Sequence, residues 1–245
     1  MAHRPRHVLI TGGSRGIGLA IAQLFSKNAY RCTLISRSEP DLKTAIASLT
    51  PLPSTSSPET PSNPETHDPA EPPSYQHGYI AGDISLGSNF WHLHPSRPFI
   101  AHLPKPERTA FSTHPSRIDV VVNCAGVTQA KLFSGLNEED LESIVRTNLT
   151  SMMLGTKFLL RQAEDKAPVI INVSSLLGLQ GGYGAVAYAA SKAGVLGFTR
   201  ALATEYASHK VRVNAIVPGY VETDMTKGTH ATVLFVKVCS NHGQT

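Results

Sequence analysis

Cysteine is scarce in this sequence, and so are long apolar runs. The three cysteines, Cys32, Cys124 and Cys239, are odd in number and match neither a disulfide framework nor the paired spacing of a metal site. No apolar run approaches the roughly 18 to 20 residues of a membrane helix, and no charged-then-apolar leader precedes the first expected strand, His7–Thr11. We therefore expect reduced thiols, no metal ion and no membrane insertion.

The sequence also lacks a strong bias toward one sign of charge. Lysine and arginine total 22 and aspartate and glutamate 18, which gives a net charge of +4, and the basic residues are scattered. This balance favours an anionic cofactor and argues against nucleic acid as a partner. The expected location is the cytoplasm, and the basic start, Met1–Arg6, leaves the mitochondrial matrix as an alternative.

Short runs rich in valine and isoleucine alternate with helical patterns along the chain. Such runs are typical of strands buried on both faces, and their alternation with helices predicts a parallel sheet with right-handed crossovers. With 245 residues the chain suits a single α/β domain, a Rossmann-type doubly wound sheet. The expected strands are Val8–Thr11, Arg31–Ser36, Ile118–Val122, Val169–Val173 and Val211–Val217, and the expected helices are Ile17–Lys27, Asn137–Gln162 and Ala187–Ser208.

Three stretches depart from this pattern. Of the 17 prolines, 13 lie between Pro51 and Pro115, so we expect residues 50–76 to be a disordered Pro/Ser-rich insertion and residues 86–117 an irregular Pro/His-rich one. The latter holds four histidines whose spacings fit no compact ligand set. Residues 228–245 form an atypical tail, in which the apolar run Val233–Val238 is either an edge strand or aberrant sequence.

The first chemical motif is the glycine-rich run from Thr11 to Gly18, which follows a strand and opens a helix. Glycines there permit a tight turn and a close approach of the backbone to a pyrophosphate, and the helix N-terminus offers free N–H groups. The second strand ends in Ser36 and Arg37 rather than in the acid typical of NAD sites. Arg37 and Arg15 could bind the 2′-phosphate of NADP; the alternative is two ordinary surface arginines.

The second motif pairs Tyr188 with Lys192, four residues apart within a helical pattern. This spacing places both side chains on one helix face, where the lysine charge, together with the positive charge of an oxidised nicotinamide, would favour ionisation of the phenol. Ser175 ends an upstream strand, thirteen residues before Tyr188, where parallel sheets bind ligands. The plainer alternatives are a chance surface pair and a serine that caps a turn.

Six ordered motifs resemble the short-chain dehydrogenase/reductase family, most closely the 3-oxoacyl-acyl-carrier-protein reductases and carbonyl reductase family member 4. They are Thr11–Gly18, Asn123-Cys124-Ala125-Gly126, Asn148, Ser175, Tyr188 with Lys192, and Pro218-Gly219-Tyr220-Val221-Glu222-Thr223.

The resemblance implies a catalytic set and a cofactor set. Tyr188 would protonate the carbonyl oxygen, Lys192 would lower its pKa and bind the nicotinamide ribose, Ser175 would polarise the carbonyl, and Asn148 would hold a water at a helix kink. The cofactor, NADPH or NADP, would contact Gly12, Ser14, Arg15, Gly16, Ile17, Gly18, Arg37, Asp83, Ile84, Asn123, Ala125, Gly126, Tyr188, Lys192, Pro218, Gly219, Val221 and Thr223.

The implied reaction is the NADPH-dependent reduction of a ketone, foremost a 3-oxoacyl thioester of acyl carrier protein or coenzyme A. Another carbonyl compound, such as a steroid or quinone, and an inactive NADPH-binding partner subunit are the alternatives. The resemblance also makes a homo-oligomer an expectation, although the segment that usually builds its C-terminal interface is missing.

Overall fold

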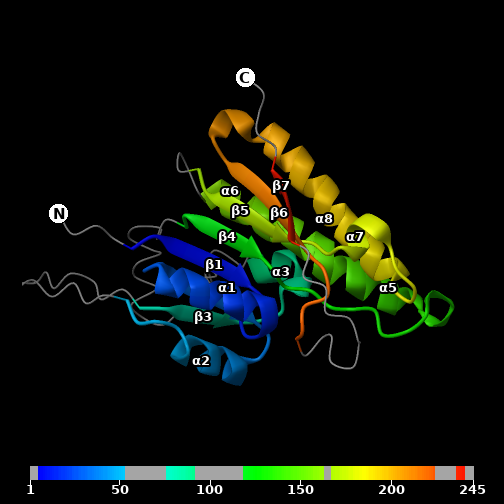
Figure 1. Cartoon of the computed structure of the whole chain (residues 1–245), viewed down its shortest axis with the longest axis horizontal. Helices are drawn as coiled ribbons and strands as arrows, with labels where there is room; N and C mark the ends of the chain where they lie inside the picture. Colours follow the sequence, from blue (N-terminus) through cyan, green and yellow to red (C-terminus); the bar gives the residue numbers. More distant parts are fainter. Residues whose placement is uncertain (1–4, 53–75, 92–117, 163–166, 224–235, 241–245) are drawn as a thin grey trace, which may run out of the picture.

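A seven-stranded sheet separates two layers of helices in the computed structural model, which describes residues 5–52, 76–91, 118–162, 167–223 and 236–240 (Figure 1). The order across the sheet is β3-β2-β1-β4-β5-β6-β7. The strands are β1 (His7–Thr11), β2 (Arg31–Ser36), β3 (Gly78–Ala81), β4 (Val120–Asn123), β5 (Val169–Val173), β6 (Arg212–Pro218) and β7 (Val236–Ser240).

The first six strands are parallel, which confirms the predicted Rossmann-type sheet. The chain winds outward from β1 to β3, crosses back to β4 and winds outward again to β6. The order therefore reverses between β1 and β4, and ligands of such sheets bind at this switch point, beyond the carboxyl ends of the strands.

Helices cover both faces of the sheet. On one face α1 (Gly16–Lys27) and α2 (Glu39–Ala47) pack against inward residues of β1 and β2. On the other face, α3 (Ser88–Trp91), α6 (Ser151–Gln162) and α8 (Val186–Glu205) pack against the alternate strand residues. Because side chains alternate across a strand, neighbours such as Val8 and Leu9 belong to different cores, and both are fully buried.

Two of the helices begin at residues whose side chains satisfy free N–H groups. At α5 (Glu138–Val145), Asn137 accepts from the Asp140 N–H and Asp140 accepts from the Asn137 N–H, a capping box. Ser38 accepts the Asp41 N–H at the start of α2. Polar residues in these positions fix where α5 and α2 start.

The expected helix Asn137–Gln162 is interrupted in its middle. The π-helical turn η4 (Arg146–Thr150) separates α5 from α6 and contains Asn148, at the kink that the sequence predicts. An inserted residue of this kind widens the helix locally and is frequent at functional sites.

Two of the three unusual stretches contain regular structure. Residues 86–91, the start of the stretch expected to be irregular, complete the short helix η1 (Ile84–Leu86) and form α3. They are ordered because Phe90 and Trp91 are buried in the core. In the tail, β7 pairs antiparallel with β6, so an edge strand forms there, three residues later than the expected run.

The remainder of these stretches, with His92, His94, His102 and His114, lies outside the described residues. Within the described part of the chain, no helix is long and apolar enough to cross a membrane.

Candidate active site

A cavity of about 250 Å³ opens at the carboxyl ends of the parallel strands, on both sides of the switch point. The glycine-rich loop, the ends of β2 to β6 and the first turns of α8 line it. Nearly all the residues that the resemblance implies meet here. Its lining includes Gly12, Ser14, Arg15, Gly16, Ile17, Gly18, Arg37, Asp83, Ile84, Ala125, Gly126, Ser175, Tyr188, Lys192, Pro218, Gly219, Val221 and Thr223.

The glycine-rich loop forms one wall and has no room for a side chain at Gly12 or Gly18. Gly12 has φ +69°, and a Cβ there would lie 2.8 Å from the Ala125 Cα. At Gly18 a Cβ would lie 2.2 Å from the Gly12 carbonyl oxygen. The loop can therefore bring its backbone against a ligand at the N-terminus of α1, as a pyrophosphate requires.

Arg15 and Arg37 lie at the end of the cavity beside β2, and both are exposed. The nearest acid along the chain, Glu39, is not part of the cavity lining. Its carboxylate accepts from the Lys43 amine at 3.0 Å and from the Tyr79 hydroxyl at 3.0 Å, and these contacts lower its pKa. The acid that could compete for a ribose hydroxyl is thus engaged by side chains of α2 and β3.

The opposite end of the cavity brings together Ser175, Tyr188 and Lys192. Ser175 follows β5, while Tyr188 and Lys192 lie one turn apart on α8. The Ser175 side chain hydrogen-bonds the Tyr188 phenol and also accepts the Leu177 N–H at 3.2 Å. The serine therefore caps a turn and also contacts the tyrosine, and its role toward a substrate carbonyl stays a prediction.

Lys192 is a buried cation beside Tyr188. Its Nζ donates to the Val173 carbonyl at 2.9 Å and lies 5.8 Å from the centre of the Tyr188 ring. Burial lowers the pKa of Lys192 to about 8, against a smaller opposite effect of Cys124. One of its three N–H groups is engaged by Val173, which leaves two for a ligand.

Burial favours the neutral form of the Tyr188 phenol. Burial raises the pKa of Tyr188, and the hydrogen bond from Ser175 opposes that rise only in part. The lowering expected from Lys192 together with an oxidised nicotinamide stays a prediction, because burial outweighs the influence of the protein's own groups on this pKa. A lowered value would need additional positive charge, such as that of an oxidised nicotinamide.

Two predicted residues, Asn148 and Asn123, are not part of the cavity lining. Asn148 Nδ2 donates to the Val127 carbonyl and to Ser191 Oγ, both at 3.0 Å, and its Oδ1 accepts the Val127 N–H at 2.8 Å. On this side chain, only the second lone pair of Oδ1 remains to accept a hydrogen bond from a water.

The side chain of Asn123, a member of the predicted cofactor set, is engaged inside the protein. Its Nδ2 donates to Thr156 Oγ1 at 3.0 Å and to Asn172 Oδ1 at 2.8 Å, and the residue is absent from the cavity lining. Its position on β4 directs the amide into a buried polar chain that joins α6 to α8 through Thr199. Strand alternation, which sends neighbouring side chains to opposite faces, could have separated it from the loop residues that follow.

Sequence patterns also missed contributors to the site. Ser174 lies in the cavity lining and donates from Oγ to the Lys192 carbonyl at 2.7 Å, which ties β5 to α8. Gln129 accepts N–H groups of the first turn of α8 from 58 residues away. No local sequence signal marks either role, because both depend on partners brought together by the fold.

This geometry coincides with a sequence relationship. A profile of the short chain dehydrogenase family matches residues 6–57 and 108–233. The chain belongs to this family and is an oxidoreductase of its type.

Among its relatives, a 3-oxoacyl-[acyl-carrier-protein] reductase of Homo sapiens is 33% identical over 220 residues, which cover 89% of this chain and 76% of that protein. Carbonyl reductase family member 4 of Danio rerio is 31% identical over 223 residues, or 91% of this chain and 78% of its own. A crystal structure from Sinorhizobium meliloti, described as a short-chain alcohol dehydrogenase, has a TM-score of 0.67 and 29% identity, and covers 91% of this chain and 75% of its own.

Proposed function

We propose that this oxidoreductase reduces a ketone with NADPH, and that the ketone is a 3-oxoacyl thioester of acyl carrier protein or coenzyme A. The observation that carries the proposal is a single cavity with the glycine-rich loop and two arginines at one end and Ser175, Tyr188 and Lys192 at the other. The names of the relatives from Homo sapiens and Chlamydia pneumoniae, 3-oxoacyl-[acyl-carrier-protein] reductases, support the substrate class.

The residues present fit a nicotinamide dinucleotide. The glycine-rich wall matches a pyrophosphate, and Asp83, at the end of β3, lies in the cavity lining where the adenine would be bound. Arg15 and Arg37 would form charge-assisted hydrogen bonds to a 2′-phosphate. Pro218, the last residue of β6, and Thr223, which follows the strand, would border the nicotinamide. When bound, the cofactor supplies a hydride to the carbonyl carbon.

The protein's own groups would handle the carbonyl oxygen and its proton. The Tyr188 hydroxyl would donate its proton to the oxygen as negative charge develops there, and the Ser175 hydroxyl would donate a hydrogen bond to the same atom. The phenol is neutral in the pocket and so holds the proton that the reduction requires. Lys192, with two N–H groups left, would bind ribose hydroxyls and place its charge near the phenolate that forms.

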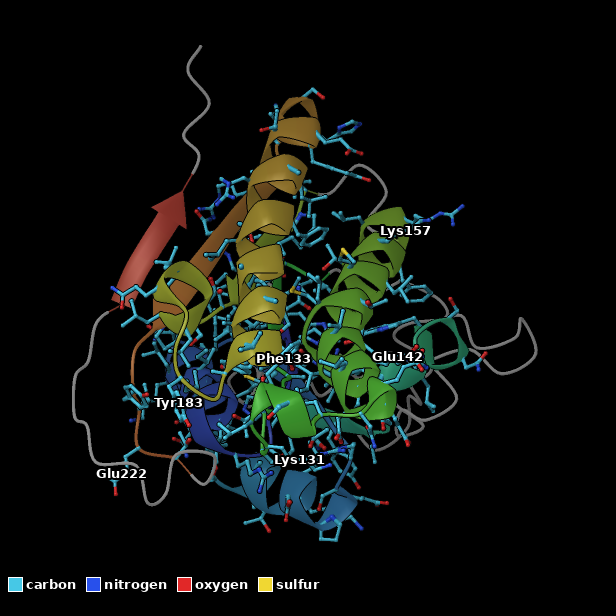
Figure 2. The ribbon with its side chains drawn as sticks, turned by 90° about the vertical axis from the view of Figure 1, so that its right-hand side faces the viewer. Lys131, Phe133, Glu142, Lys157, Tyr183 and Glu222 are labelled. Atoms are coloured by element: carbon cyan, nitrogen blue, oxygen red, sulfur yellow. The ribbon has the colours of Figure 1, made fainter. Side chains whose placement is uncertain are left out.

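An exposed apolar rim beside this end of the cavity favours a substrate with an apolar chain. Leu132 and Phe133, on the loop after β4, are 50% and 55% exposed, and Tyr183, just before α8, is 94% exposed. A Cβ at Gly184 would lie 3.7 Å from Leu132, so the two segments are in contact. Figure 2 shows Phe133 and Tyr183 around the lower, N-terminal end of α8. The acyl chain of a thioester would lie against such a surface.

The test combines cofactor affinity with turnover. We expect NADPH to bind more tightly than NADH, and Arg37→Asp to reverse that order, since the change replaces a donor to the phosphate with a charge that repels it. We also expect NADPH oxidation with acetoacetyl thioesters of acyl carrier protein and of coenzyme A. Tighter binding of NADH by the unmodified chain would remove the NADPH proposal. NADPH binding without turnover of any ketone would favour the inactive partner subunit.

A further inference from the structure

The helix that carries Tyr188 and Lys192 has no local cap. Its N-cap residue, Ala185, offers no side-chain acceptor. Gln129, on the loop after β4, takes that place: its Oε1 accepts the Ala187 N–H at 2.8 Å and the Tyr188 N–H at 3.4 Å. These are the second and third residues of α8, whose N–H groups an N-cap side chain ordinarily satisfies.

The capping amide is itself held in place. Gln129 is 9% exposed, and its Nε2 donates to the Lys131 carbonyl at 2.8 Å. Two N–H donors on one side and a carbonyl on the other define which end of the amide is the oxygen. Two residues earlier, Val127 is fixed by the hydrogen bonds of its N–H and carbonyl to Asn148, which also contacts α8 through Ser191.

The capped backbone belongs to the proposed proton donor itself. Tyr188 lies in the first turn of α8, where unsatisfied N–H groups favour fraying. Its phenol must stay within hydrogen-bond reach of Ser175, which belongs to a different element, the end of β5. A small displacement of the first turn would separate the two hydroxyls without unfolding the helix, and a misplacement of about 1 Å can lower a rate about 10²-fold.

We propose that Gln129 is a positioning residue that caps the catalytic helix from the neighbouring loop and thereby sets the place of Tyr188 against Ser175. The inference rests on the proposed reductase function for its kinetic part. The cap is a property of the polypeptide and can be measured without substrate. The geometry also predicts that a cap supplied locally, at Ala185, can replace Gln129.

The experiment compares three variants of the full chain. Gln129→Met keeps the size of the side chain and removes the acceptor. Gln129→Met/Ala185→Ser supplies a local hydroxyl acceptor at the N-cap, where Ala185 is only half-buried. Lys131→Met is the matched control on the same loop, since it removes a surface cation that pairs with Asp140 and leaves the Lys131 carbonyl in place. Amide hydrogen exchange at Ala187 and Tyr188 and steady-state kinetics are measured for each.

In Gln129→Met we expect exchange at these two amides to accelerate by at least about fivefold, the scale of a lost cap, and kcat to fall by about tenfold with an unchanged KM for NADPH. The double variant should recover both, and Lys131→Met should alter neither. Unchanged exchange and kcat in Gln129→Met would overturn the proposal. Recovery of exchange in the double variant without recovery of kcat would overturn the positioning role and leave a cap that serves structure alone.

A failure of the proposed function gives a different pattern. If the unmodified chain reduces no ketone, the kinetic comparison is replaced by exchange alone. Faster exchange confined to the first turn of α8 in Gln129→Met, reversed by Ala185→Ser, then supports the cap, and its absence refutes it.

Discussion

At the scale of single residues, burial affects the pKa values of Tyr188 and Lys192 more than their contact with each other does. Burial raises the pKa of the phenol and lowers that of the amine, so the pocket opposes charge on both groups. A proton donor that is neutral at rest suits the reduction of a carbonyl. The same burial makes ionisation of Tyr188 dependent on positive charge brought in by a ligand.

Replacement of Tyr188 by phenylalanine tests the proposed acid directly. Tyr188→Phe removes one hydroxyl and keeps the ring, so turnover should fall by a factor of about 10² to 10⁴, the usual contribution of a positioned acid. The dissociation constant of NADPH, measured by fluorescence titration, should change little. A variant that retains most of its turnover would show that another group delivers the proton.

Lys192 predicts a pH dependence of stability with a definite sign. Its pKa in the folded chain, about 8, lies below the ordinary value of 10.5. Below pH 8 both states carry the charge; between about 8 and 10.5 the folded state loses its proton first, so unfolding takes up a proton and the free energy of unfolding rises with pH. The difference in this free energy between the unmodified chain and Lys192→Met should therefore increase across that window, as measured by urea denaturation.

An exposed lysine provides the control for this measurement. Hydrogen bonding to Glu39 raises the pKa of Lys43, so its contribution is complete below the ordinary lysine value and is lost as pH rises through the folded value. The corresponding difference for Lys43→Met should decrease at high pH. The same trend for both lysines would contradict the assignment of a buried, charge-opposing environment to Lys192.

At the scale of elements, local sequence signals predicted what local physics determines. The runs at β1, β2 and β5 match the observed strands, and the glycine-rich motif lies between β1 and α1 as expected. The short strand β3 was not predicted, because its four residues lie between polar and glycine residues and give little hydrophobic periodicity. Helix α3 formed within a proline-rich stretch because Trp91 is buried, a tertiary gain that no local pattern reports.

In the candidate site, too, local sequence signals predicted some positions, and tertiary packing determined others. Motif residues on loops, such as Arg37 and Thr223, lie in the cavity as expected. Asn123 belongs to a recognised motif, yet its amide faces the interior, since contact with Asn172 and Thr156 depends on how β4, β5 and α6 pack. Gln129 is the converse case, a residue outside every motif that the fold places at the start of α8.

The buried polar chain between helices α6 and α8 should contribute to stability. Asn172 is fully buried, accepts from Asn123 at 2.8 Å and donates to Thr199 at 2.9 Å. Asn172→Val would remove one hydrogen bond from each partner, while Asn123 keeps its bond to Thr156 and Thr199 keeps its bond to the Val195 carbonyl. At about 0.5 to 1.5 kcal/mol for each lost bond, we expect a loss of about 1 to 3 kcal/mol. Denaturant unfolding measures it.

A surface position on α8 serves as the comparison. The Thr204 hydroxyl donates to the Arg200 carbonyl on the exposed side, and Thr204→Val should change the free energy of unfolding by less than about 0.5 kcal/mol. Equal effects of the two substitutions would show that the polar chain adds nothing beyond an ordinary exposed hydrogen bond.

At the scale of the whole molecule, the tail completes the sheet. β7, from the C-terminal part of the chain, pairs with β6 and runs antiparallel to it. It forms the edge of the sheet opposite to β3 (Figure 1). An uncovered β6 would present a row of free N–H and carbonyl groups on a strand made largely of apolar residues. The pairing with β7 moves that edge one strand outward.

Removal of residues 236–245 should therefore expose alternate amides of β6 and leave the others protected. Ile216 and Pro218 direct their carbonyls toward β5, where they accept the Ser174 and Leu176 N–H groups. Because backbone groups alternate along a strand, Ala215 and Val217 direct theirs toward β7, opposite Cys239 and Lys237. In the truncated chain, hydrogen exchange should accelerate strongly at Ala215 and Val217 and much less at Ile216. The exposed edge of β6 should also promote association of the protein, which light scattering detects at high protein concentration. Uniform acceleration along all of β6 would instead mean that the strand itself depends on β7 to fold, and unchanged exchange would mean that β7 does not pair with it in solution.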